Sequence, residues 1–246
     1  KWIMDPSNKN PKYERTIIRN KLKKENSQFK ESLKEKINLY TSRRTVYEEM
    51  LSDFFVKFLK FKIYGRFYIE KNEFLKLEKD IQIEVLKRIL STNSGKKYPP
   101  KQKSVVRLID KINDECNGIY TLSSNLIKND QKNISFLRES KKTFNEMKNG
   151  IFIKNGDSKI WDFRFLVKST KQDLFCEPIT ISNWKNIKKI FFKNQTRRIS
   201  FEIIKTLPLI NFSKKMLIPF VSSMSDLKNE GIDVIFYPSS QLTSNK

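Results

Sequence analysis

The chain has 246 residues, of which 38% are hydrophobic and 12% aromatic, enough to bury the cores of two modest domains and to exclude a disordered chain. No apolar run approaches the roughly 18 residues of a membrane span and no basic-then-apolar leader opens the sequence, so we expect a cytoplasmic protein without membrane partners. The absence of histidine excludes imidazole bases and His-ligated zinc, and the net charge of +23 suggests a polyanionic partner such as nucleic acid.

The first nineteen residues combine a turn with two arginines. The segment from Asp5 to Asn8 is typical of a turn, because Pro6 fixes φ and the polar side chains around it bond to nearby backbone. We expect a helix to follow, with Arg15 and Arg19 one turn apart on the same face. Such a pair can grip a phosphate or a carboxylate with forked donors, although an ordinary capped helix with a solvated basic face has the same pattern.

Helical periodicity dominates the first half of the chain. Apolar side chains recur at intervals of three and four over residues 26–62, which predicts a long amphipathic helix. Capping residues predict further helices from Asn72 and from Asp80, the latter ending at Gly95. Residues 21–116 are therefore predicted to form a helical domain.

The pattern changes after Asn117-Gly118. Alternating and β-branched runs predict strands over 119–128, 133–138, 150–154, 160–168, 207–212, 215–221 and 234–237. Asn155-Gly156 is a hairpin signal, and helices are expected over 182–192 and 196–205. The predicted fold class is α+β, an N-terminal helical domain followed by a smaller, mixed, strand-rich C-terminal domain over 117–246.

Two stretches concentrate positive charge beyond the excess that a Lys-rich, Ala-free composition spreads over the whole chain. Both are candidate RNA contacts, since loops and helix ends commonly meet phosphates, and both are also typical of a solvated face. The first contains Lys96, Lys97, Lys101 and Lys103. The second contains Lys185, Lys188, Lys189, Arg197 and Arg198 without any acid. Its Phe191 and Phe192 fit either base stacking or a buried helical stripe.

Several motifs resemble one enzyme family. Trp2, the turn from Asp5 to Asn8, Tyr13, Arg15 and Arg19 resemble the segment that closes the catalytic domain of tRNA(Ile)-lysidine synthetases. Residues 81–109 are similar to the family's helical substrate-specificity domain. The strings Tyr120-Thr121-Leu122-Ser123, Phe136-Leu137-Arg138-Glu139 and Ile160-Trp161-Asp162-Phe163-Arg164-Phe165 look like its β-rich C-terminal part. In the last string Phe163 stands where the family tends to have Gly.

The resemblance implies three parts and an activity. Residues 1–20 would be the tail end of the catalytic ATP-pyrophosphatase domain, 21–116 the helical substrate-specificity domain and 117–246 the β-rich tRNA-binding domain. The full-length enzyme uses ATP and Mg²⁺ to adenylylate the wobble cytidine of isoleucine tRNA, and lysine then displaces AMP to form lysidine. By resemblance, Asp5, Asn8, Arg15 and Arg19 border the catalytic pocket or support its last helix.

The residues that such chemistry needs are missing from this sequence. The family's Ser-Gly-Gly-x-Asp-Ser loop does not occur, and the single Ser-Gly pair, Ser94-Gly95, precedes two lysines and is no Walker A loop either. Cys116 and Cys176 lie far apart, form no metal-ligand pair and are expected as buried free thiols.

We therefore expect no catalytic residue and no bound cofactor in these 246 residues, which we interpret as the tRNA-recognition portion of a longer enzyme. The alternatives are a free-standing basic RNA-binding protein without catalytic activity and a divergent, inactive relative. The sequence leaves the oligomeric state open.

Overall fold

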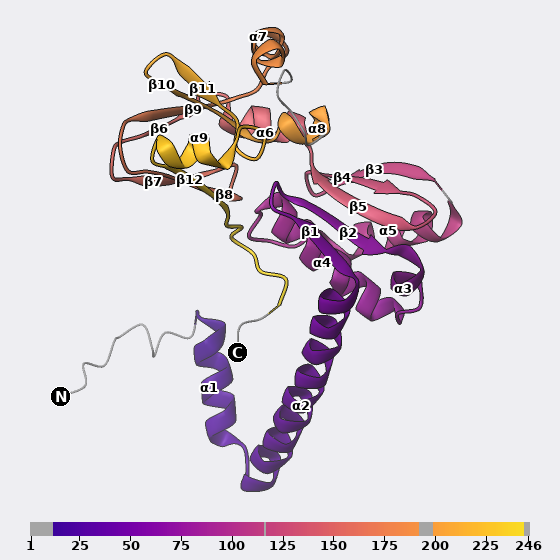
Figure 1. Ribbon diagram of the computed structural model, residues 1–246. Helices are drawn as coiled ribbons and strands as arrows, with labels where there is room; N and C mark the ends of the chain where they lie inside the picture. The colour runs from indigo at the N-terminus through magenta and orange to yellow at the C-terminus, as the bar shows by residue number, and fades with distance from the viewer. Residues whose placement is uncertain (1–11, 116, 192–198, 244–246) are drawn as a thin grey trace, which may run out of the picture. The chain divides into compact units, whose positions relative to one another are not determined.

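The computed structural model describes residues 12–115, 117–191 and 199–243, and gives the backbone alone at residues 186 and 189–191. Helices and antiparallel sheets together make an α+β fold, as predicted (Figure 1). Contacts divide the chain into two compact units, residues 1–50 and 51–246. None of the described helices is long and apolar enough to cross a membrane.

The first unit consists of α1 (Glu14–Lys24) and most of α2 (Ser27–Phe58), which confirms the predicted long helix except over residues 59–62, where a strand forms instead. Asn26 caps α2, because its side-chain oxygen accepts a 2.7 Å hydrogen bond from the Phe29 amide. The apolar positions of α2 within this unit are largely exposed, as at Ile37 and Tyr40. Leu51, Phe54 and Phe55 of α2, which belong to the second unit, are buried there.

The first lobe of the second unit, residues 51–138, is built on a five-stranded antiparallel sheet in the order β1-β2-β5-β4-β3. Its strands are β1 (Leu59–Lys62), β2 (Arg66–Glu70), β3 (Gly118–Leu122), β4 (Asn125–Asn129) and β5 (Asn133–Arg138). Its helices are α3 (Lys71–Leu75), α4 (Lys79–Ser94) and α5 (Gln102–Asp114). Because β2 pairs with β5, the predicted domain boundary between residues 116 and 117 falls inside this sheet.

Helix α4 is the centre of the first lobe. It is buried on nearly all its faces, and it packs against α5 and against strands of the sheet (Figure 1). Gly95 ends it in a left-handed conformation, with φ at +66°, as the sequence predicted. A Cβ at Gly95 would also lie 2.5 Å from the carbonyl oxygen of Phe163, so only glycine fits where this helix end meets a turn of the neighbouring lobe.

The second lobe, residues 139–237, contains two smaller antiparallel sheets, in the orders β11-β10-β9-β6 and β12-β8-β7. The strands are β6 (Ile151–Ile153), β7 (Ser158–Trp161), β8 (Phe165–Ser169), β9 (Leu174–Pro178), β10 (Pro208–Phe212), β11 (Lys215–Leu217) and β12 (Ile232–Phe236). The helices are α6 (Ser140–Met147), α7 (Ile181–Phe191), α8 (Phe201–Ile204) and α9 (Met224–Asn229). One apolar core, which includes the fully buried Trp161, joins the two sheets.

The second lobe departs from the sequence prediction in several ways. The predicted strand over 160–168 is divided by the turn at Asp162 and Phe163 into β7 and β8, which pair with each other. Asn155-Gly156 does not form the expected hairpin, because β6 pairs with β9 while β7 pairs with β8. Helices α6 and α9 and strand β9 were not predicted, since short elements carry too few residues for a clear periodicity.

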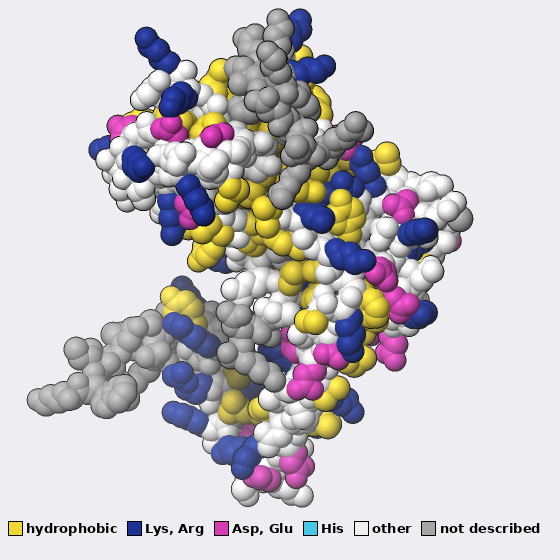
Figure 2. Space-filling view, viewed as in Figure 1, with side chains coloured by type: hydrophobic (Ala, Val, Ile, Leu, Met, Phe, Trp, Pro, Cys, Tyr) yellow, Lys and Arg dark blue, Asp and Glu magenta, His cyan; other side chains and the backbone are white. Residues whose placement is uncertain are grey.

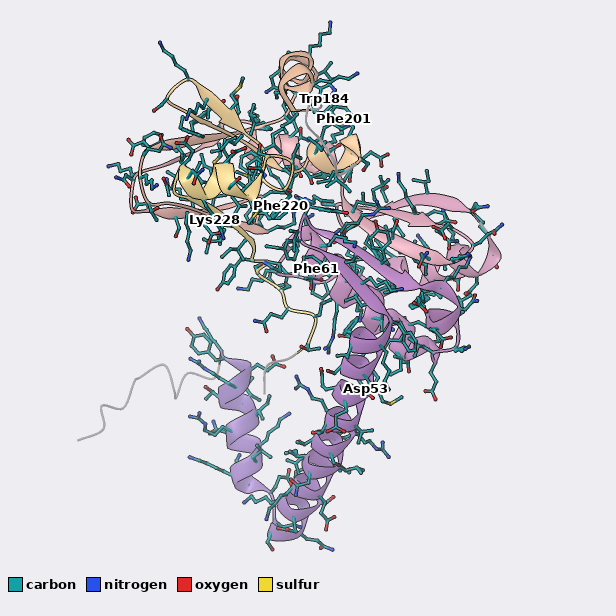
Figure 3. All side chains as sticks on the ribbon, in the orientation of Figure 1. Asp53, Phe61, Trp184, Phe201, Phe220 and Lys228 are labelled. Atoms are coloured by element: carbon teal, nitrogen blue, oxygen red, sulfur yellow. The ribbon has the colours of Figure 1, made fainter. Side chains whose placement is uncertain are left out.

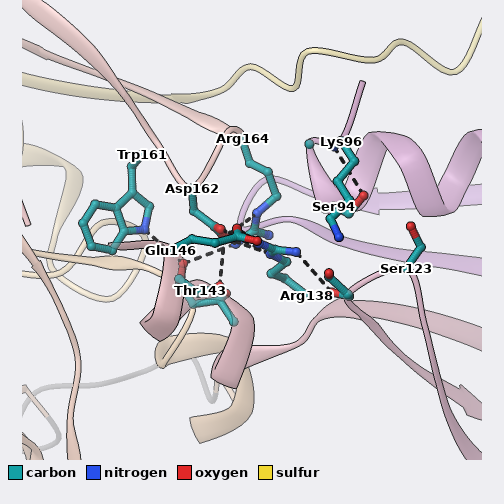
Figure 4. A network of polar contacts seen from close by, with 12 residues as sticks. Ser94, Lys96, Ser123, Arg138, Thr143, Glu146, Trp161, Asp162 and Arg164 are labelled. Atoms are coloured by element: carbon teal, nitrogen blue, oxygen red, sulfur yellow. Dashed lines mark hydrogen bonds and ion pairs between the residues drawn. The ribbon is translucent and has the colours of Figure 1, made fainter. Parts of the chain in front are cut away.

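A buried ionic network joins the two lobes (Figure 4). Arg138, the last residue of β5, donates to both carboxylate oxygens of Asp162, which lies in the turn between β7 and β8. Arg164 donates to Asp162 Oδ2 through Nε at 2.9 Å and through Nη2 at 2.6 Å. Thr143 of α6 donates to the same oxygen, and Glu146 of α6 pairs with Arg138. Two arginines thus face two carboxylates.

The network holds Asp162 ionised although the side chain is fully buried. Burial, the largest single effect, raises the pKa of Asp162, but the charges of Arg164 and Arg138 and the hydrogen bonds from Arg138 and Thr143 together outweigh it and lower the pKa below 3.8. A lowered pKa stabilises the folded state above the pKa of the unfolded chain. This contribution to stability is lost as the pH falls from 3.8, the ordinary pKa of an aspartate, through the lower pKa of Asp162 in the folded state.

Replacing Asp162 should remove the negative charge that two buried arginines, Arg138 and Arg164, share. We expect Asp162→Ala to lower the free energy of unfolding by about 3–5 kcal/mol, the cost of breaking a buried ion pair from one side. Urea denaturation at neutral pH measures this. Asp157→Ala, at an exposed position of the same lobe, is the matched control and should change stability by less than about 0.5 kcal/mol. Equal effects of the two substitutions would show that the network does not stabilise the fold.

Candidate nucleic-acid interface

The two arginines of the opening motif lie on one face of α1, as predicted. Arg15 and Arg19 line an open groove of about 490 Å³ within the first unit. Ile18 and Leu22 form its apolar floor, and the remaining lining residues are Lys23 and Lys30. Arg15 also lies over the ring of Tyr13, 5.2 Å from the centroid. Four cationic residues and no acidic one line the groove, and because most of the lining surface is apolar, the cations contribute mainly their aliphatic stems to it. Asp5 and Asn8 lie outside the described residues.

The first basic stretch lies on the link between α4 and α5. All four predicted RNA-contact lysines of this stretch are exposed: Lys96, Lys97, Lys101 and Lys103. Lys101 precedes the first residue of α5, and Tyr98, which is 75% exposed, stands between the two pairs. Lys97 Nζ lies 5.9 Å from the centre of the Tyr98 ring. The structure therefore gathers cations and an exposed aromatic ring on one short segment.

The second basic stretch is described in part. Lys185 and Lys188 are exposed on α7, while Ile187 on the same helix is fully buried. The side chain of Lys189 and all of Arg197 and Arg198 lie outside the described side chains, as do the phenylalanines at 191 and 192.

An aromatic pair that the sequence did not predict accompanies this stretch. Trp184 of α7 lies against Phe201 of α8, with ring centroids 4.1 Å apart (Figure 3). The ammonium group of Lys205 lies 4.8 Å from the centre of the Phe201 ring. The signal in the sequence was the Trp within a run of lysines, but its partner lies 17 positions further along the chain, beyond the reach of helical periodicity.

Over 12–115, 117–191 and 199–243, no three Cys, Asp or Glu side chains come together in a group that could hold a metal ion. Cys176 is buried in β9 as expected, and burial raises its thiol pKa to about 12, so it stays protonated at neutral pH. Cys116 lies outside the described residues.

Positive charge is spread over the visible face rather than gathered in one patch (Figure 2).

Comparison with known proteins identifies the relatives of this chain. A tRNA(Ile)-lysidine synthase of Rickettsia akari is 26% identical over 97% of the chain. The chain is similar in sequence to several tRNA(Ile)-lysidine synthases. One from Orientia tsutsugamushi is also 26% identical over 97% of the chain, and one from the Wolbachia of Brugia malayi is 31% identical over 58%. No protein-family model matches the chain.

The similarity to tRNA(Ile)-lysidine synthases confirms the resemblance drawn from the motifs. The chain spans about half the length of the relatives that it matches, 56% for the Rickettsia akari protein and 57% for the Orientia tsutsugamushi protein. The region aligned with the Rickettsia akari protein takes in the first unit and both lobes, because it includes 97% of the chain.

The exposure of Arg19 allows its structural role to be tested. Because Arg19 is exposed and lines an acid-free groove, we expect Arg19→Gln to change the free energy of unfolding by less than about 0.5 kcal/mol. Chemical denaturation followed by circular dichroism measures this. Arg138→Gln, in the buried network, serves as the destabilising reference. A comparable loss of stability in both variants would show that Arg19 supports the helix rather than offering its charge to a ligand.

Proposed function

We propose that this chain is the tRNA-recognition portion of a tRNA(Ile)-lysidine synthase, a ligase that attaches lysine to the wobble cytidine of isoleucine tRNA. The observation that carries the proposal is similarity over nearly the whole chain to enzymes of that name. The exposed lysines between α4 and α5 and on α7 supply the phosphate-binding charge that such a role needs. The protein would work in the cytoplasm.

In the whole enzyme, ATP and Mg²⁺ would activate the cytidine and lysine would be the small substrate. The residues described here do not fit a magnesium site, since none of their acidic groups cluster to hold a metal ion. What these residues offer is charge that positions a polyanion: Arg15 and Arg19 at the groove of α1, and the exposed lysines of the second unit.

The alternative function is a basic RNA-binding protein that performs no ligation. The net charge of +23 favours it as much as it favours the enzyme part, because charge alone does not distinguish them. The two functions differ in partner choice. A tRNA-recognition part discriminates isoleucine tRNA from other tRNAs, whereas a general RNA-binding protein relies mainly on phosphates and shows little discrimination.

The lysines between α4 and α5 give the first test. We expect replacement of Lys96, Lys97, Lys101 and Lys103 by Gln to weaken binding of isoleucine tRNA and to flatten its salt dependence. Each lost phosphate contact should reduce the slope of log K against log salt by about 0.7 to 0.9. Fluorescence anisotropy between about 50 and 200 mM salt measures both quantities.

The matched control removes the same charge elsewhere in the second unit. Lys141, Lys142, Lys154 and Lys159 are exposed and can be changed to Gln together. Long-range attraction falls equally in both variants, so only a difference between their slopes reports direct contact. Equal slopes would mean that the loop lysines form a solvated face.

The second test concerns catalysis. Because the family's Ser-Gly-Gly-x-Asp-Ser loop does not occur in its sequence, the 246-residue chain is expected to release no AMP or pyrophosphate from ATP when lysine and tRNA are present. A radiolabelled-ATP assay with thin-layer separation detects such release. Adenylylation that depends on tRNA would show that the chain carries chemistry of its own.

A further inference from the structure

Phe163 adopts a backbone conformation that a phenylalanine rarely takes. Asp162 and Phe163 have φ values of +49° and +57°, and the Arg164 amide donates to the Trp161 carbonyl at 3.0 Å, which defines a tight type I′ turn. Asp tolerates the left-handed region, whereas for Phe it costs about 1–2 kcal/mol relative to glycine. The strain is not offset by burial, since the Phe163 side chain is 53% exposed. An exposed ring held in a strained turn calls for another role.

Three segments of the chain meet at this turn. Gly95 lies against the backbone and Cβ of Phe163, which brings the start of the loop with Lys96 and Lys97 to this turn. The C-terminal segment joins them: the Tyr237 amide donates to the Arg164 carbonyl at 2.6 Å, and Ser239 and Ser240 donate to the carbonyls of Gly95 and Lys96. Figure 4 shows Asp162 and Arg164 together with Ser94, the last residue of α4, and Lys96, which follows that helix.

We call this surface the Gly95 corner and define it by five exposed residues: Lys96, Lys97, Tyr98, Phe163 and Tyr237. Tyr98 is 75% exposed and Tyr237 is 58% exposed, so three aromatic side chains reach solvent around two lysines.

The charges at the Gly95 corner all have one sign. No Asp or Glu occurs in residues 93–109, 163–169 or 237–246. The one acid of the turn, Asp162, is buried and already shared by two arginines, so it does not neutralise the lysines. Exposed aromatic faces beside cations without acids are the chemistry of a site for single-stranded nucleic acid, in which bases stack and phosphates pair.

We propose that Phe163 stacks on an unpaired nucleobase of bound RNA while Lys96 and Lys97 contact the phosphates that flank it. The phenylalanine ring has no hydrogen-bonding group, so the stack is tolerant of base identity. The base must be unpaired, because bases inside a helix have their faces covered by their neighbours. This inference rests on the proposed function, since it names the part of the RNA that one surface of the second unit meets, where the two lobes adjoin.

The experiment uses three substitutions of Phe163 and a transcript of isoleucine tRNA. Phe163→Leu keeps an apolar side chain in the turn but removes the aromatic face, and should weaken binding by about fivefold or more, the loss of one base–aromatic stack. Phe163→Gly should weaken binding similarly and at the same time raise the urea midpoint, because glycine relieves the turn. Phe163→Trp should bind at least as tightly as the parent chain.

A stability gain together with a binding loss in Phe163→Gly is an outcome that a purely structural role of the ring does not produce. Phe152→Leu, at a 47% exposed phenylalanine on β6, is the matched control and should leave binding unchanged. A transcript that contains 4-thiouridine should form a photo-cross-link to the peptide with Phe163, and the cross-link should map to an unpaired position.

Three results would overturn the inference. Parent-like tRNA binding by Phe163→Leu shows that the ring makes no stack. An equal loss of affinity for a fully paired RNA duplex shows that no unpaired base is involved. Failure of the parent chain to bind the tRNA removes the proposed function as well, which distinguishes that outcome from the first two.

Discussion

The buried carboxylate of Asp162 is the constraint on which the second unit depends. It accepts hydrogen bonds from two arginines that come from different lobes, and all three side chains are essentially inaccessible to water. Burying such a group is costly unless its charge is balanced and its hydrogen bonds are made. These contacts tie the end of β5 to the β7–β8 turn, so the network helps to fix how the two lobes meet, while Arg164 Nη1 is buried without a hydrogen-bond partner.

That constraint explains the geometry of the turn. For the Asp162 carboxylate to reach Arg138, the chain must reverse within the two residues Asp162 and Phe163, both at positive φ. The turn is then packed against Gly95, and Arg164 on its far side also donates to the carbonyl of Thr206, which extends the network to the segment before β10. Phe163 is thus held outward by the same contacts that bury its neighbours on either side. The network thus explains why position 163 is exposed, but it does not explain why that position holds a phenylalanine.

The sequence predicts the elements that depend on residues close together in the chain. It does not predict the strand pairings, which depend on residues far apart in the chain. The α4 helix and its end at Gly95 followed from periodicity and capping, because those signals lie within a few positions of one another. The pairing of β2 with β5 did not, since residues 66–70 and 133–138 are joined by contacts that no local pattern encodes. For the same reason Asn155-Gly156 was wrongly taken as a hairpin: its turn chemistry is correct, with Gly156 at φ +86°, but the flanking strands pair elsewhere.

The candidate interface shows the same division. Exposure of Lys96, Lys97, Lys185 and Lys188 could be expected from composition, because lysines rarely leave the surface. Composition cannot distinguish a lysine that binds a phosphate from a lysine that is only solvated. Neighbours in space distinguish two kinds of lysine: the segments around Lys96 and Lys97 carry no exposed acid and present exposed rings, whereas Lys60 pairs with Glu70 and Lys215 with Glu230. A lysine that is already paired with a carboxylate gains less electrostatic stabilisation from a phosphate than a lysine without an acid beside it. The net charge of +23 therefore favours RNA binding mainly where the exposed lysines have no acidic neighbour.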